Sequence, residues 1–171
     1  MRQPAADEKI STVMLYTPTM LVRGDLILRE SIKVSIWLRT QGVPNFIHLL
    51  NAQIVQLASG APKTYSKEEA FVPTPEVMAF HLAPPAHDPL DYDASEANRR
   101  MQLVQVLMGS FVMKANMRLS TATDVAASLD VMNAPWISLY EAEVTNPAIP
   151  QFAVNVPMLL ARPSKVMIGL M

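Results

Sequence analysis

The sequence FIHLLNAQI at residues 46–54 has a related sequence, WISLYEAEV, at residues 136–144. The identical aligned positions are Ile47/Ile137, Leu49/Leu139 and Ala52/Ala142. The remaining positions include pairs that are close in kind, such as Phe46/Trp136. An internal repeat sets the architecture before any other feature is considered. We infer that the chain contains one small β-rich unit written twice.

Two further pairs of stretches extend the repeat on either side. GDLILRESIKVS (24–35) resembles GSFVMKANMRLS (109–120), and FVPTPEVMAF (71–80) resembles LLARPSKVMIG (159–169). The upstream partners have an offset of 109 − 24 = 85, whereas the central partners have an offset of 136 − 46 = 90. The second unit is therefore predicted to carry five extra residues between its second and third strands.

A short helix is predicted to hold these extra residues. Thr123 or Asp124 has a side chain suited to capping a helix N-terminus, and Val125–Met132 follows with apolar residues on one face. Elsewhere the pattern is that of strands. Residues 20–29 and 31–39 alternate apolar and polar side chains, which is typical of strands with one buried face.

The two central strands are predicted at residues 46–57 and 136–145, with Phe46 and Trp136 buried at their starts. Gly24 and Gly109 occupy the same phase in the aligned stretches. A glycine inside a strand often marks a bulge or a sharp bend. We therefore predict that both glycines are bends in matching strands.

Five short strands per unit predict an all-β fold of two tandem five-stranded small barrels, with one short helix in the second. Residues 83–100 are proline-rich, then acidic, then basic, which is typical of a boundary. The predicted divisions are a flexible arm (1–13), a first barrel (14–82), a linker (83–102) and a second barrel (103–171).

The predicted third strands share the pattern L-x-x-A-x-[IV], in LLNAQI and LYEAEV. With the strand count, this pattern resembles that of tandem Sm-like small barrels over about residues 20–82 and 103–171. The chain is also similar to an uncharacterised bacterial family of such barrels, which implies no particular activity. The Sm-like RNA pocket has Arg-Gly before the last strand, where this chain has Pro-Thr-Pro-Glu (73–76) and Arg-Pro-Ser-Lys (162–165).

The residues that carry common enzyme chemistry are not arranged for it. The chain has no cysteine, and its five glycines are too dispersed for G-x-G-x-x-G or a phosphate loop. G-x-S-x-G and H-E-x-x-H are also absent. We expect no enzyme, no cofactor and no metal. His48 is interpreted as a satisfied core or edge residue. His81, His87 and the acidic residues at 88–96 are interpreted as a solvated linker, although such oxygens could also bind a hard cation.

Basic residues share the outward phase of the predicted strands, with one tryptophan among them. A basic stripe with an aromatic residue can follow single-stranded nucleic acid, and it is also typical of a solvated sheet face. The net charge of −1 gives no basic surplus. The candidate nucleic-acid face consists of Arg23, Arg29, Lys33, Trp37, Arg39, Lys114 and Arg118.

The predicted last strand, Lys165–Met171, is apolar and carries one charge. A strand edge of that composition must be covered, because its backbone groups invite pairing with another chain. We expect Val166, Ile168 and Leu170 to form such an edge. The function favoured is a non-catalytic structural or scaffolding module that self-associates into a homo-oligomer, and the alternative is an Sm-like or OB-like nucleic-acid binder. Without a secretory apolar segment or an apolar run of about 18 residues, a cytoplasmic location and no membrane span are expected.

Overall fold

The computed structural model describes residues 3–40, 43–57 and 60–171. Within them the chain forms ten strands, two short α-helices and two 3₁₀ turns. In chain order these are β1 (Glu8–Tyr16), β2 (Met20–Arg29), α1 (Val34–Trp37), β3 (Phe46–Gln56), β4 (Lys63–Pro73), η1 (Thr74–Glu76), β5 (Ala79–Leu82), β6 (Arg99–Met108), β7 (Phe111–Ser120), α2 (Val125–Val131), β8 (Ile137–Thr145), β9 (Ala153–Ala161), η2 (Pro163–Lys165) and β10 (Met167–Leu170).

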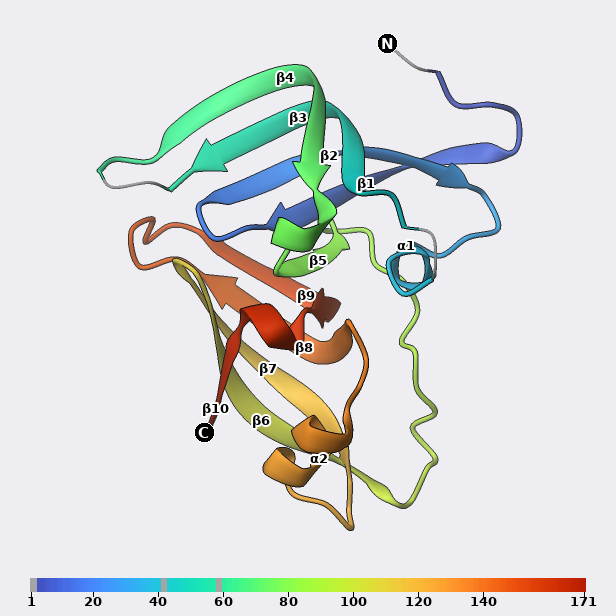
Figure 1. Cartoon of the computed structure of the whole chain (residues 1–171), viewed down its shortest axis with the longest axis vertical. Helices are drawn as coiled ribbons and strands as arrows, with labels where there is room; N and C mark the ends of the chain where they lie inside the picture. The colour runs from blue at the N-terminus through green and yellow to red at the C-terminus, as the bar shows by residue number, and fades with distance from the viewer. Residues whose placement is uncertain (1–2, 41–42, 58–59) are drawn as a thin grey trace.

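The strands form one antiparallel sheet in the order β10-β6-β7-β8-β9-β5-β1-β2-β3-β4. Each half has the same internal order, with its fifth strand beside its first, and β9 of the second half pairs with β5 of the first. The two halves are stacked along the long axis, with β4 at the top and β10 toward the bottom (Figure 1). The all-β prediction is confirmed. The predicted pair of closed barrels is not found, because the sheet of the described residues is open and ends at β4 and β10.

Two hydrophobic cores form, and each draws on both halves of the chain. The first contains Val22 and Ile47 together with Trp136 from the second half. The second contains Phe111 and Leu139 together with Tyr16 from the first half. The end of β1 serves both cores, since consecutive residues of a strand point to opposite faces. The two repeats therefore share their packing.

The register of the strands corrects the predicted alignment of the repeats. Arg23 pairs with Gln53, as Lys114 pairs with Glu143, so Gly24 corresponds to Ala115 and lies 91 positions before it. Gly109 instead lies in the turn between β6 and β7 with φ +57°. Gly24 does lie at a bulge, since the register of β2 against β3 shifts between Arg23 and Asp25. The predicted match with Gly109 is wrong, because the local resemblance of residues 24–35 to 109–120 has the wrong offset.

The true offset removes the predicted five-residue insertion. β2 and β7 end at Arg29 and Ser120, an offset of 120 − 29 = 91, and the central strands keep an offset of 137 − 47 = 90. The second half therefore has one residue fewer in this connection, and both halves carry a short helix there. α2 begins at Val125 as predicted.

A β-bulge recurs at one position of the third strand in each half. Asn51 and Glu141 have positive φ values of 48° and 49°, where the pairing with the second strand shifts register. Asn51 Nδ2 donates to Asp25 Oδ2 at 3.0 Å, and Asn116 Nδ2 donates to Glu141 Oε2 at 2.7 Å. The amide and the carboxylate have exchanged strands, yet the contact that holds the bulge is the same. Bulges bend a strand and increase its twist, so both halves bend at this point.

Residues 31–39 do not form the predicted strand, because Val34–Trp37 form α1. Val34 and Leu38 are four residues apart and both are buried, whereas Ile36 between them is exposed. That spacing is one face of a helix. The α1 N-cap, Lys33, makes no side-chain cap, and Asp88 Oδ2 accepts from Ser35 N at 2.7 Å in its place. In α2 the chain provides its own cap, since Asp124 Oδ1 accepts from Ala127 N at 2.7 Å.

Other boundaries also differ from the predictions. β1 begins at Glu8, inside the predicted arm, and β6 begins at Arg99, inside the predicted linker. β4 runs from Lys63 to Pro73, inside the predicted first barrel (14–82). Phe46 is 53 % exposed, against the prediction that it is buried, whereas its counterpart Trp136 is 4 % exposed.

Candidate interaction site

The joint between the two halves is a short antiparallel pairing of β5 with β9. Ala79 lies opposite Ala161, and Phe80 lies opposite Leu160. All four side chains are buried, with Phe80 at 1 % and Leu160 at 2 % exposure. These contacts place apolar side chains of one half in the core of the other.

Arg162 extends this joint beyond the strand pairing. Its N–H donates to Met78 O at 2.8 Å, its Nε donates to Val77 O at 3.1 Å, and its Nη2 donates to Thr74 O at 3.1 Å. Its guanidinium also lies 4.4 Å from the centre of the Trp136 ring. One arginine thus binds the end of β9 to the turn before β5.

The two outer strands, β4 and β10, are equivalent to the two strands of this joint, but each has a neighbouring strand on one side only. The strand registers identify the equivalent positions. In β4, Phe71 lies opposite His48, just as Leu160 of β9 lies opposite Ser138. In β10, Ile168 lies opposite Val106, just as Phe80 of β5 lies opposite Leu15. Phe71 therefore corresponds to Leu160, and it is 60 % exposed.

The predicted edge residues lie at or beside β10. Ile168 and Leu170 are in the strand and Val166 immediately precedes it. Val166 and Ile168 are half-buried against the second core, and Leu170 is exposed. Met167, which corresponds to the fully buried Ala79, is 62 % exposed. The two free edges thus expose apolar groups where the internal joint buries them.

The linker is held against the second half at Asp91. Its carboxylate accepts from Ser138 Oγ at 2.6 Å, from Tyr140 Oη at 2.6 Å and from Arg39 Nη1 at 2.7 Å. Arg39 Nη2 also donates to Ser138 Oγ. Burial by itself would raise the pKa of Asp91, but these donors outweigh it and lower that pKa. Burial and the neighbouring carboxylate raise the pKa of Tyr140, so the phenol stays protonated and donates.

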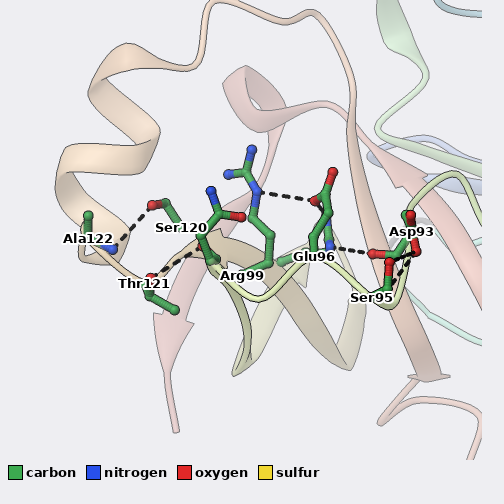
Figure 2. A network of polar contacts seen from close by, with 9 residues as sticks. Asp93, Ser95, Glu96, Arg99, Ser120, Thr121 and Ala122 are labelled. Carbon is green, nitrogen blue, oxygen red and sulfur yellow. Dashed lines mark hydrogen bonds and ion pairs between the residues drawn. The ribbon is translucent and has the colours of Figure 1, made fainter.

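A second polar network holds the end of the linker, as Figure 2 shows for Asp93, Ser95, Glu96 and Arg99. Ser95 N and Oγ donate to Asp93 Oδ1 at 2.8 and 2.7 Å. Glu96 Oε2 lies 2.8 Å from Arg118 Nη1 and 3.5 Å from Arg99 Nε. Arg118 Nη2 donates to Asp93 O at 2.8 Å. The linker is therefore fastened along its length.

These contacts divide the residues predicted as a nucleic-acid face. Arg39 and Arg118 are engaged by Asp91 and Glu96. Trp37 is at the end of α1 and Lys33 precedes that helix, so neither lies on a strand with the others. Arg23 and Arg29 are exposed on β2, and Lys114 is exposed on β7. The predicted face is therefore divided between strands, α1 and linker contacts, and nucleic-acid binding stays a prediction.

The histidines lie in different settings. His48 stacks on Phe71 with ring centres 4.5 Å apart, and its Nε2 lies 2.8 Å from Glu69 Oε2. His81, interpreted from the sequence as part of the linker, is buried in β5. Its Nδ1 lies 2.7 Å from Leu82 O and its Nε2 lies 2.9 Å from Tyr16 Oη. Since Leu82 O can only accept, Nδ1 carries the proton and Nε2 accepts from Tyr16. Burial lowers the pKa of His81 to about 4.

Comparisons of this chain with protein-family models, with curated proteins and with solved structures found no match. Neither α1 nor α2, nor any other helix in the described part of the chain, has the length and apolarity to cross a membrane.

Proposed function

We propose that the protein is a non-catalytic structural module that self-associates head to tail, by pairing β10 of one copy with β4 of the next. The observation that carries this proposal is the internal joint of β5 with β9. The chain pairs a fifth strand with a fourth strand once within itself, and it leaves one strand of each kind at its outer edges.

The internal joint also predicts the register between copies. Ile168 would lie opposite Phe71 of the next copy, as Phe80 lies opposite Leu160 in the joint. Met167 would likewise lie opposite Val72, as Ala79 lies opposite Ala161. Pairing would cover the exposed side chains of Phe71 and Met167. Full burial of one large apolar side chain is favourable by about 1.5–3 kcal/mol. Unpaired apolar edges are the sites at which sheets associate.

One residue makes the expected contact between copies weaker than the internal joint. Pro73 follows Val72 where Arg162 follows Ala161, so this edge lacks both an N–H and a guanidinium. Proline at an edge limits pairing because it cannot donate to a ladder. We therefore expect reversible association that depends on concentration. A repeated head-to-tail contact closes into a ring when its rotation permits, and otherwise it extends as a fibre.

Site-directed cross-linking tests this proposal directly, because the natural chain has no cysteine. Phe71→Cys and Ile168→Cys would be prepared as separate variants, mixed, and treated with a short bismaleimide. We expect a cross-linked pair in the mixture and little product from either variant alone. Absence of product in the mixture would contradict self-association. A product from Phe71→Cys alone would show pairing of like edges and would contradict the head-to-tail arrangement.

A further inference from the structure

The first half has an open groove. At the equivalent position of the second half, the linker fills the space. The groove has a volume of about 220 Å³ and is lined by residues of β2, α1 and β3, with Pro44 between the helix and β3. Ile27, Trp37, His48 and Leu50 line it, and the half-exposed Phe46 stands at its wall. This volume is below that of typical ligand pockets, and it suits one inserted side chain.

The equivalent site in the second half holds Asp91 and Tyr92. Tyr92 packs edge-on against Tyr140, with ring centres 4.8 Å apart, and the Arg118 guanidinium lies 4.7 Å from its ring centre. Ser138 and Tyr140 both donate to Asp91.

The strand registers identify the counterparts of these contacts. His48 corresponds to Ser138 and Leu50 to Tyr140 at an offset of 90, and Ile27 corresponds to Arg118 at an offset of 91. All three counterparts line the open groove. The residues that hold the linker in one half therefore have equivalents in the other half, and no described segment fills the groove between them. Of these equivalents, His48 contacts Phe71 and Glu69 of β4 at its side.

The chemistry of the open groove differs from that of the filled one. Leu50 and Ile27 cannot bind a carboxylate, and Glu69 lies 2.8 Å from His48 and adds negative charge beside it. A buried carboxylate without donors is costly, whereas an aromatic ring gains from apolar walls. We propose that this groove binds an extended peptide segment from a partner, which inserts a phenylalanine-like side chain and has no carboxylate before it.

This inference does not depend on the proposed self-association. The groove is lined by neither β4 nor β10. Its probe can be designed from the chain itself, because the linker segment PLDYDASE (89–96) fills the equivalent site. The two probes are that peptide and PLAFDASE, which carries Asp91→Ala and Tyr92→Phe.

Binding would be followed in the full chain by the indole N–H resonances of its two tryptophans. Trp37 lines the groove, and Trp136 is buried in the first core and serves as an internal control. We expect PLAFDASE to shift the Trp37 resonance saturably, with PLDYDASE weaker by about tenfold, the ratio that 1.4 kcal/mol produces. Trp136 should not move. Absence of a Trp37 shift at millimolar peptide, or equal shifts with both peptides, would overturn the proposal.

An exchange of residues makes the test specific. The variant Ile27→Arg/His48→Ser/Leu50→Tyr gives the groove the chemistry of the second half, and it should prefer PLDYDASE over PLAFDASE. If this variant does not fold, Ile27→Arg alone places a charge on a partly exposed position and should abolish PLAFDASE binding. Unchanged binding by a folded variant would overturn the proposal. A concentration-dependent Trp37 shift that occurs without peptide and persists in Met167→Lys, which blocks the proposed edge contact, would show that a second copy fills the groove, and would overturn the proposal also.

Discussion

The internal joint and the two outer edges use equivalent strands but differ in what covers them. At the joint, Phe80 and Leu160 meet in a buried core and Arg162 adds three donors to backbone carbonyls. At the edges, Phe71 and Met167 are more than half exposed and Pro73 stands where the arginine would be. The joint is therefore part of the folded unit, whereas the edges are suited to a contact that forms and dissociates.

Truncating a side chain should lower the free energy of unfolding at the joint but not at the outer edge. Leu160→Ala removes a buried side chain at the joint and should lower the free energy of unfolding by about 2–5 kcal/mol. Phe71→Ala at the matching exposed position should change it by no more than about 0.5 kcal/mol in dilute protein. Urea unfolding at low protein concentration measures both. Equal losses for the two variants would contradict the distinction between joint and edge.

The next effect is a pH dependence that belongs to the joint alone. His81 has a folded pKa of about 4 against an ordinary value of 6.5, so the unfolded chain binds the proton first as the pH falls. Its contribution is complete above pH 6.5 and is lost between pH 6.5 and about 4, by roughly 3 kcal/mol at about 1.36 kcal/mol per pKa unit. Gly169 is the counterpart on β10, where no such titration can occur.

His81→Gln isolates this contribution, because carboxylates such as Asp91 titrate in both proteins. We expect urea unfolding between pH 4 and 7 to show a shallower pH slope for the variant than for the natural chain. The variant should also be less stable at pH 7, since the buried Tyr16 hydroxyl loses the imidazole nitrogen to which it donates. Parallel slopes for the two proteins would contradict the buried neutral imidazole.

The smallest expected effect concerns the edge itself. Pro73→Arg would restore the N–H and the guanidinium that Arg162 supplies at the joint. A net gain of about 1–1.5 kcal/mol from restored hydrogen bonds corresponds to association that is roughly tenfold tighter. Pro73→Ala is the matched control, since it restores only the N–H. Sedimentation velocity over a concentration series would detect the change, and equal affinities for the arginine variant and the natural chain would refute the equivalence of the two sites.

Much of the fold could be predicted from the sequence because the signals are local. The central strands follow from the paired stretches at 46–54 and 136–144, and α2 follows from its cap at Asp124. The pattern at α1 is ambiguous, because residues 32, 34, 36 and 38 are all apolar and satisfy the period of a strand. The i, i+4 pair Val34 and Leu38 satisfies a helix equally well, and the linker residue Asp88 caps that helix from 53 positions away.

The rest of the site could not be predicted because its partners are distant in the chain. Arg162 contacts carbonyls 85 and 88 residues away, and Asp91 accepts from hydroxyls 47 and 49 residues away. The predicted glycine alignment is wrong for the same reason. Gly24 and Gly109 match by letter, but only the partner strand reveals that Ala115 is the counterpart of Gly24.

Self-association through the outer edges would raise the mass of the protein in solution above that of one chain. Light scattering at micromolar concentration should give the natural chain a mass above 18.9 kDa that rises with concentration. Met167→Lys changes an exposed side chain and should return the mass to that of one chain, 18.9 kDa, without unfolding it. Lys165→Arg is the matched control and should associate as the natural chain does. A natural chain that stays at 18.9 kDa at every concentration would contradict the account.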